Sequence, residues 1–516
     1  MPERRFKKSL GDIDYSTMKK VAVIGSGFSG ISSACFLANE GFDVTIFEKN
    51  DSQGGRARKL EAQGFTFDMG PSWYWMPDVF ESFFKNFGKL PSDYYQLKRL
   101  DPSYRIFYTQ EDMLDIPVGK QNLCNVFETL EPGSSQSLLK FLKEAQYKYE
   151  IGIQDLVYKP GLSLGEFIDF RLLKGILKLH VFQSISSHVR KYFKHPKLIQ
   201  LLEFPVLFLG TSPQNTPALY SLMNYADMAL GTWYPLGGMY KVIDGMVSLA
   251  SSLGVKFKFN STVNQIIVDE ARATGLLVNN KIEKFQYIVA AADYHHVEQD
   301  LLPASHRRYN ETYWQNRSMA PSSLIFYLGV NKPLEKLLHH NLFFDQDFSL
   351  HAEEIYENPS WPTNPLFYVC CPSKSDPTVA PPGQENVFML IPVAPGLKDD
   401  EDTRKKYFDL TLSRLERLTG QTIRKSITFY KSYAHRDFAN DYNAFKGNAY
   451  GLANTLGQTA YFKPSIVNKK VVNLFYAGQL TVPGPGVPPA IISGEIAARE
   501  LIRHYNSRDA KKFVEV

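Results

Sequence analysis

Cysteine is scarce in this sequence, and the scarcity narrows the kinds of protein it can be. The 516 residues contain four cysteines, Cys35, Cys124, Cys370 and Cys371. These are too few for a disulfide framework in a chain of this length, so we expect a reducing compartment. No CxxC pair and no His/Cys cluster with metal-ligand spacing occurs in the sequence. We therefore expect the pairs His295-His296 and His339-His340 to be ordinary surface or loop histidines, and we predict no metal site.

Long apolar runs and an excess of charge are also missing. The longest apolar stretch, Leu198 to Leu209, is interrupted by polar residues and a proline, and it is shorter than the roughly 18 residues that span a bilayer. The basic tail over residues 1–18 is followed by too short an apolar run for a secretory signal. A formal net charge of +5 is too diffuse to indicate a nucleic-acid partner. The sequence therefore predicts a cytoplasmic protein whose membrane contact is peripheral.

Aromatic residues, by contrast, are abundant. Phe, Trp and Tyr make up 14% of the chain, more flat apolar surface than a core alone requires. A large apolar ligand would explain this excess. The content of 44% hydrophobic residues is that of an ordinary globular protein, and the length fits about three domains or two large ones.

The amino-terminal region has the order of a dinucleotide-binding unit. Residues 19–24 are typical of a buried strand, a helical pattern follows residue 30, and a second strand over residues 43–47 ends on Glu48. Between the first strand and the helix, Gly25 permits a tight turn, Gly27 lets backbone approach a pyrophosphate, and Gly30 lets the helix pack against the strand. The amino terminus of that helix would face the phosphates.

Glu48 indicates which nucleotide is bound. It lies 23 residues after Gly25, close to the separation of about 20 expected of an acid that accepts hydrogen bonds from ribose hydroxyls. Its charge would repel a ribose 2′-phosphate. The sequence therefore predicts an adenosine-type dinucleotide and not NADP.

The segments after Glu48 distinguish FAD from NAD. The glycine pair at 54–55 allows backbone near a phosphate or ring, and Arg56 and Arg58 can offer charge-assisted hydrogen bonds to a pyrophosphate. The run from Gly25 to Pro71 resembles the glutathione-reductase-type flavoproteins with a GGR motif, which include amine oxidases, protoporphyrinogen oxidases and carotenoid desaturases. The Gly-Pro-Ser run at residues 70–72, followed by Met-Pro at 76–77, resembles bacterial phytoene desaturases.

Two later stretches carry the same resemblance. Residues 233–239 are similar to the family's aromatic-Pro-x-Gly-Gly segment, and residues 474–488 are similar to its carboxy-terminal flavin motif. One departure is Thr481-Val482-Pro483-Gly484, where many members carry Thr-His-Pro-Gly. A histidine at that place is therefore not a candidate catalytic group in this chain.

The resemblance implies an α/β fold with a Rossmann-type FAD-binding domain of the glutathione-reductase/amine-oxidase kind, an inserted α+β substrate domain and peripheral membrane helices. After the 1–18 tail, the FAD domain would be discontinuous over residues 19–72, 236–312 and 440–516. Residues 73–235 and 313–439 would form the substrate-binding, membrane-facing domain. The residues expected to bind FAD are Gly25, Gly27, Ser29, Gly30, Glu48, Lys49, Gly55, Arg56, Gly70, Pro71, Ser72, Val263, Gly478 and Val487.

The inserted segments would hold the substrate. Five aromatic side chains are candidates for a tunnel wall, with core packing as the alternative. They are Trp73, Tyr74, Trp75 and Phe80, which follow the flavin-contacting stretch, and Tyr234. On a helical wheel over residues 169–179, Arg171, Lys174 and Lys178 share one face and aliphatic residues the other. This pattern is typical of a helix in the interface of an anionic bilayer, and equally of an amphipathic helix packed on a core.

The implied activity is FAD-dependent desaturation of a linear carotenoid precursor, from phytoene towards lycopene. Roughly forty apolar carbons, at about 0.8 kcal/mol each, would cost about 30 kcal/mol to place in water, so the tunnel should open to lipid. We expect a location on the inner face of the cell membrane, a quinone or oxygen as electron acceptor, and no assigned catalytic side chain.

Rival interpretations keep the fold. The substrate could be a later carotenoid, such as a hydroxylated one, or a thirty-carbon precursor. An amine-oxidase-like activity is less favoured by the segments at residues 70–73 and 237–239. A carrier of prenyl lipids without flavin chemistry is the alternative from a different class, and the intact Gly25, Gly27, Gly30 and Glu48 set argues against it.

Overall fold

The computed structural model describes residues 19–167 and 183–514 of the chain. The basic tail and the segment containing Arg171, Lys174 and Lys178 lie outside these residues. The expected interfacial helix is therefore untested.

A five-stranded parallel sheet forms the first structural layer. Its order is β19-β13-β1-β2-β9, with β1 (Lys20–Ile24) at the centre. Its other strands are β2 (Asp43–Phe47), β9 (Lys256–Lys258), β13 (Tyr287–Ala290) and β19 (Leu474–Tyr476). Strand β1 pairs on both sides and is covered on both faces, which explains its uninterrupted apolar sequence.

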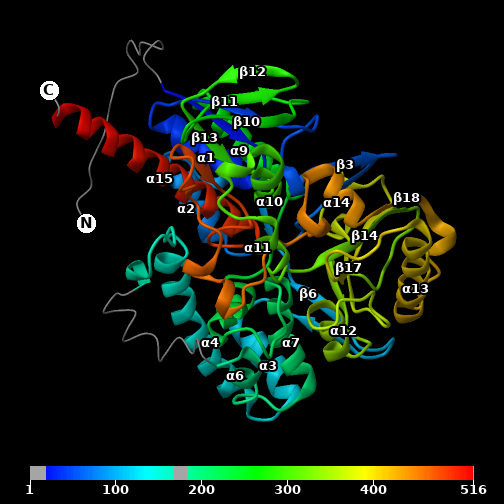
Figure 1. The fold of residues 1–516 in the computed structure, drawn as a ribbon. Coiled ribbons are helices and arrows are strands. Elements are labelled where there is room, and N and C mark those ends of the chain that lie inside the picture. Colours follow the sequence, from blue (N-terminus) through cyan, green and yellow to red (C-terminus); the bar gives the residue numbers. More distant parts are fainter. Residues whose placement is uncertain (1–18, 168–182, 515–516) are drawn as a thin grey trace.

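Three helices pack beside this sheet. Helix α1 (Phe28–Asn39) contacts both α9 (Tyr240–Ser252) and the carboxy-terminal α15 (Val487–Val514). A Cβ atom on Gly494 would lie 2.3 Å from the Ser29 carbonyl oxygen, so glycine is what allows α15 to approach α1 this closely. Figure 1 shows α1 and α15 side by side.

The elements of this half were largely predicted, with differences at their ends. The sequence pattern predicts a helix over 238–250 and strands over 263–268 and 273–278, and the structure has α9, β10 (Val263–Asp269) and β11 (Arg272–Val278) there. With β12 (Lys281–Lys284), the last two form a three-stranded antiparallel sheet. The apolar period of the sequence predicts a terminal helix to about residue 502, whereas α15 extends to residue 514. The prediction ends early because residues 503–512 are mostly polar and carry no apolar period. Strand β19 begins at Leu474, since Val471 to Leu474 form a hydrogen-bonded turn.

A seven-stranded mixed sheet forms the second layer. Its order is β18-β14-β17-β16-β15-β6-β7. The strands are β6 (Tyr104–Phe107), β7 (Met113–Ile116), β14 (Ser322–Val330), β15 (His340–Phe343), β16 (Phe367–Cys370), β17 (Glu385–Val393) and β18 (Ile427–Tyr433). Alternate residues face opposite sides. Phe343, Phe367 and Val369 join the core under α13 (Glu401–Thr419), whereas Leu342, Tyr368 and Leu390 face the core shared with the nucleotide sheet.

The remaining elements complete the two layers. In Figure 1 the helices α3, α4, α6 and α7 lie at the bottom, farthest from β12. The helices are α2 (Pro77–Lys85), α3 (Lys120–Leu130), α4 (Ser134–Ile151), α6 (Ile185–Val189), α7 (Pro196–Glu203), α8 (Leu222–Tyr225), α10 (Tyr294–His296), α11 (Glu311–Gln315), α12 (Phe348–Tyr356) and α14 (His435–Tyr442). Two short ribbons are β3 (Lys59–Ala62) with β4 (Phe65–Asp68), and β5 (Leu97–Arg99) with β8 (Trp233–Pro235).

The strands of the first layer come only from the segments predicted for the FAD domain, and those of the second layer only from the inserted segments. The predicted α/β class is confirmed, while the domain boundaries themselves stay a prediction. Across the described residues, the helices include none with both the length and the apolar character needed to cross a membrane.

Candidate dinucleotide site

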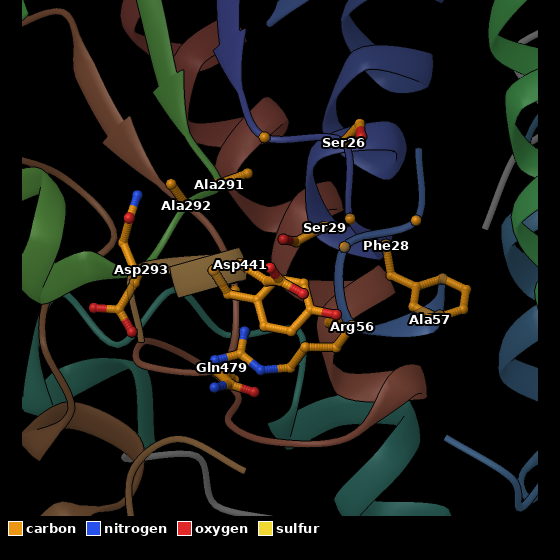
Figure 2. Close-up of a pocket in the computed structure, with 18 of the residues that line it drawn as sticks. Ser26, Phe28, Ser29, Arg56, Ala57, Ala291, Ala292, Asp293, Asp441 and Gln479 are labelled. Atoms are coloured by element: carbon orange, nitrogen blue, oxygen red, sulfur yellow. The ribbon is translucent and has the colours of Figure 1, made fainter. Parts of the chain in front are cut away.

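A cavity of about 290 Å³ lies where the parallel strands end. The residues that follow β1, β2, β13 and β19 all contribute to its wall, including Gly25, Glu48, Ala291 and Gly478. Carboxyl ends of parallel strands are where open α/β sheets bind their ligands. Figure 2 shows Ser26, Ser29, Ala291, Ala292 and Asp293 around this cavity.

The turn between β1 and α1 is shaped by its glycines. Gly25 has φ +101°, a conformation that favours glycine, and a Cβ atom on Gly30 would lie 2.0 Å from the Gly25 carbonyl oxygen. In the described chain no side chain caps the amino terminus of α1, so its first N–H groups remain donors for a ligand. Gly27 and Ser29 line the cavity at this terminus, which therefore suits an anionic group such as a pyrophosphate.

Glu48 lines the same cavity and is fixed beside the glycine turn. Its carboxylate accepts hydrogen bonds from the Ser26 amide at 3.0 Å, the Ser26 hydroxyl at 2.8 Å and the Asn50 amide at 2.9 Å. Val263 lies at the start of β10 and lines this same cavity. A buried acid held in place by three donors is suited to the ribose role predicted for it.

Arg56 is the buried cation of the cavity. Its guanidinium donates to the Asn448 carbonyl oxygen at 3.2 Å and lies 5.1 Å from the centre of the Tyr442 ring. Its Nε atom is buried and has no hydrogen-bond partner among residues 19–167 and 183–514. Burial lowers the pKa of Arg56, and the nearby Asp293 opposes this. An unpaired guanidinium N–H in this position can donate to an anionic ligand; Figure 2 shows the side chain extending across the pocket toward Gln479.

The structure brings most of the predicted cofactor residues together. Those that line the cavity are Gly25, Gly27, Ser29, Glu48, Lys49, Gly55, Arg56, Gly70, Pro71, Val263, Gly478 and Val487. Gly30 lies behind the wall, against Gly25. Ser72 turns away, and its hydroxyl lies 3.0 Å from that of Tyr368. Lys49 is already engaged, because its ammonium donates to the Asn440 carbonyl oxygen at 2.5 Å.

Sequence reasoning missed a group of polar residues on the opposite wall. Asp441, Tyr442 and Asn443, at the end of α14, line the cavity together with Gln479 and Asp293. Asp293 caps α10 by accepting from the His295 and His296 amides, and its burial raises its pKa. An Asp just before a short helix was a usable signal for the cap, whereas no local pattern marked the residues of α14.

A second, apolar cavity of about 50 Å³ adjoins the first. Leu390 and Tyr450 line both cavities, so the two cavities share part of their wall. The rest of the apolar cavity comes from the inner face of the second sheet and from α12. It includes Leu342, Phe344, Ile355 and Tyr368.

The predicted tunnel residues do not line either of these cavities in the described structure. Tyr74 stacks on Phe80 with ring centres 4.2 Å apart, Trp75 donates to the Thr232 hydroxyl at 2.8 Å, and Tyr234 packs on His339. Trp73 stacks on His340. These five side chains make packing contacts around the apolar core, and their role as a tunnel wall near the ring stays a prediction, because aromatic content alone cannot distinguish a wall from a core.

The expectation that His339 and His340 are ordinary surface or loop histidines is wrong. His339 and His340 are 4% and 0% exposed, and His340 is the first residue of β15. His295 and His296 are partly exposed and pair with Glu311 and Asp300, as ordinary surface histidines do. The sequence shows the pairs as similar dipeptides; only the three-dimensional neighbours distinguish them.

Comparison with known proteins identifies the family. The family model described as flavin containing amine oxidoreductase matches residues 28–502. The chain belongs to this flavin-containing family. Bound flavin fits the residues present, since the glycine turn, the helix terminus and Arg56 converge on one cavity, and the predicted cofactor FAD agrees with the family.

Two curated members of this flavin-containing family show the branch. The chain is 42% identical over 486 residues to a carotenoid 3,4-desaturase from Haloarcula japonica, covering 93% of this chain and 98% of the relative. It is 33% identical over 494 residues to a 4,4′-diapophytoene desaturase (4,4′-diaponeurosporene-forming) from Staphylococcus haemolyticus, covering 93% and 98%. The predicted membership among carotenoid desaturases is therefore confirmed.

Solved structures agree on the fold. Cyclohexylamine oxidase from Brevibacterium oxydans superposes with a TM-score of 0.58 at 13% identity, covering 95% of this chain and 100% of that one. An oxidoreductase from Methanosarcina mazei gives a TM-score of 0.59 at 16% identity, covering 92% and 99%. At these identities the likeness concerns the fold alone.

Proposed function

We propose that this protein desaturates a linear carotenoid precursor, from phytoene towards lycopene, with FAD as the cofactor. One observation carries the proposal: the dinucleotide cavity adjoins an apolar cavity in a chain similar to carotenoid desaturases over nearly its full length. Among the described residues, those that line the apolar cavity are mainly aliphatic and aromatic, and none is a carboxylate that would pair with an amine. His351 also lines this cavity, and burial lowers its pKa to about 4, so its ring is neutral at neutral pH. This composition suits a polyene.

The first cavity holds the cofactor in this proposal. The α1 terminus and Arg56 bind the pyrophosphate, Glu48 the ribose, Val263 the adenine end, and Gly70, Pro71 and Gly478 the flavin end. When bound, FAD supplies an acceptor for the hydride that leaves the substrate. The protein contributes position and the exclusion of water, which the buried apolar wall provides.

Access from a membrane is part of the proposal. Three large apolar side chains, Leu162, Tyr461 and Phe462, are 37%, 40% and 53% exposed. They belong to one surface region, since Gly161 lies against the Ala460 carbonyl group and the Val482 side chain. Residues 480 and 481, next to Val482, line the dinucleotide cavity. A protein located on the cytoplasmic face of the membrane would take its substrate up from lipid beside this patch, and reduced cofactor would pass electrons to a quinone or oxygen.

The test is a pigment assay. Purified protein with bound FAD is incubated with phytoene in liposomes, with a quinone or oxygen as acceptor, and the extracted pigments are analysed by absorbance and mass. We expect a series of longer polyenes, each two hydrogen atoms lighter than the one before. An intact flavoprotein that leaves phytoene unchanged while desaturating another carotenoid would refute the substrate assignment.

A later carotenoid is the second candidate substrate. It is favoured by the higher identity to the carotenoid 3,4-desaturase, 42%, than to the diapophytoene desaturase, 33%. Supplying lycopene and a hydroxylated carotene in parallel with phytoene separates the two. Turnover of only the later substrates would establish this alternative.

A further inference from the structure

A chain of hydrogen bonds runs along the boundary of the two cavities. Ser72 follows Pro71, which lines the dinucleotide cavity, and its hydroxyl lies 3.0 Å from the hydroxyl of Tyr368. Tyr368 lines the apolar cavity, and its hydroxyl lies 2.6 Å from Nδ1 of His340. Tyr368 thus contacts the apolar cavity, Ser72 and a buried imidazole together.

The imidazole is held rigidly. The indole of Trp73 stacks on His340 with ring centres 4.1 Å apart and planes 9° apart, and His340 pairs with Cys370 across β15 and β16. Its Nε2 atom has no hydrogen-bond partner in the described part of the chain, and neither do the two ring nitrogens of His339. The rings of His339 and His340 are 4.4 Å apart. Leaving three buried ring nitrogens unpaired costs free energy, so a stability role does not explain them.

Desaturation needs an acceptor for a proton as well as for a hydride. On the proposed carotenoid substrate, the hydride leaves one carbon and a proton leaves its neighbour, whose C–H electron pair becomes the second bond of the new alkene. FAD accounts for the hydride. Among the described residues that line the apolar cavity there is no carboxylate. The imidazole of His351 also lines it, but both of its ring nitrogens are engaged, by the Pro392 carbonyl oxygen and the Leu366 amide.

We propose that Tyr368 and His340 are the proton-accepting pair of this reaction, an inference that rests on the proposed carotenoid desaturation. The proton passes from the substrate carbon to the Tyr368 oxygen while the tyrosine's own proton passes to Nδ1 of His340. The result is an imidazolium and an intact phenol, so charge and atoms balance. Ser72 donates to the Tyr368 oxygen before the transfer and keeps it oriented. His339 and the free Nε2 side of His340 provide the onward route.

The electrostatics suit this role. Burial, with a smaller contribution from His339, keeps the pKa of His340 well below its ordinary value, and burial lowers the pKa of His339 to about 3. Both rings are therefore neutral at neutral pH, which leaves Nδ1 of His340 as the acceptor of the tyrosine hydrogen bond, and the same burial makes this imidazole a weak base. A weak base is sufficient, because loss of hydride leaves positive charge on the substrate and makes the neighbouring C–H a strong acid. Tyr368 is the catalytic residue of the pair, and His340 acts through it.

The experiment compares single-turnover reduction of the bound flavin by carotenoid, without oxygen, in wild type and variants. Tyr368→Phe and His340→Ala should lower the rate by at least about 100-fold, the lower range for general acid–base catalysis. Flavin content and the amount of carotenoid that the protein extracts from liposomes should not change. Wild type should be slower in D₂O, and Tyr368→Phe should lack this isotope effect.

His340→Asn separates proton transfer from positioning. The asparagine carbonyl can accept the tyrosine hydrogen bond but is not a base, so we expect a rate as low as that of His340→Ala. Recovery to the wild-type rate would overturn the proposal and leave His340 a positioning residue. Tyr407→Phe is the matched control, since this buried tyrosine donates to the Pro362 carbonyl oxygen at 2.6 Å on the opposite face of the sheet; its rate should equal wild type.

Three further outcomes would count against the proposal. Ligand-type atoms of His339, His340 and Cys370 lie within 4.8 Å of one another, so a stoichiometric metal ion found by elemental analysis would occupy the imidazole and overturn the proposal. If none of the carotenoids tested reduces the flavin of the wild-type protein, both the proposed function and this inference are refuted. A wild type that is active while Tyr368→Phe is equally active would defeat the inference alone.

Discussion

The two sheets of this protein recognise their ligands in different ways. The five-stranded sheet offers its ligand mainly backbone groups, from glycine turns, a helix amino terminus and strand ends. Such features have recognisable local sequence patterns. The seven-stranded sheet presents side chains from alternate positions of separate strands, such as Leu342, Tyr368 and Leu390. The comparison teaches that glycine turns and helix termini can be predicted from short stretches of sequence, even where these stretches are far apart in the chain, whereas a site made of side chains depends on neighbours that only the fold brings together.

The largest effect is expected where backbone packs on backbone. Gly30→Ala would place a Cβ atom 2.0 Å from the Gly25 oxygen, so the turn must move, and we expect little folded flavoprotein. Thermal denaturation and flavin absorbance measure this. Gly27→Ala is the control, because its Cβ atom would meet nothing within 4 Å in the described chain. It should keep the stability of the cofactor-free protein and weaken only FAD binding. An equal loss of stability in Gly27→Ala and Gly30→Ala would contradict the assignment of Gly30 to packing and Gly27 to FAD binding.

The next effect concerns the buried guanidinium. Arg56→Gln should weaken FAD binding by roughly tenfold to 100-fold, because a hydrogen bond to a charged group contributes about 1.5–3 kcal/mol. Equilibrium titration of the apoprotein with FAD gives the dissociation constant. Lys59→Gln, on a side chain that is 38% exposed and pairs with Glu61, is the control and should bind FAD normally. Unchanged affinity in Arg56→Gln would remove Arg56 from the site.

A smaller effect is expected in the apolar cavity. Ala352→Leu adds atoms to its wall and should lower carotenoid turnover several-fold while flavin content stays at the wild-type level. Pigment analysis and absorbance at the flavin band report the two quantities separately. If flavin content falls while carotenoid turnover per bound flavin is unchanged, the two sheets do not have separate roles.

The smallest effect on the folded protein is expected at the surface. Replacing Tyr461 and Phe462 by Ser should leave stability and flavin content nearly unchanged but reduce sedimentation with anionic liposomes by about tenfold, since about 1.5–3 kcal/mol is gained when such a side chain is buried. Leu90→Ser, 47% exposed on the segment after α2, is the control. If it reduces binding as much, the patch is not the docking surface.

The sequence was informative for the nucleotide sheet because period and turn chemistry are local there. The run from β1 to Glu48 predicted its strands, its helix and most of its cavity wall. Asp441 and Tyr442 reach the same wall from a distant helix, and no rule of spacing connects them to Gly25. The sequence could not decide between a tunnel wall and core packing for a related reason. Trp73 and Tyr74 are aromatic in either role, and only the fold shows that they stack on His340 of β15 and Phe80 of α2.

The position of β19 has a consequence for how the protein is made. The sheet that begins at residue 20 is completed by a strand at residues 474–476 and covered by a helix that needs Gly494 to seat on Ser29. The ribosome must therefore synthesise the chain as far as residue 476 before the parallel sheet that contains β1 is complete. FAD can therefore bind its complete site only late in synthesis. Truncation of α15 should lower the stability of the amino-terminal sheet, because it uncovers α1.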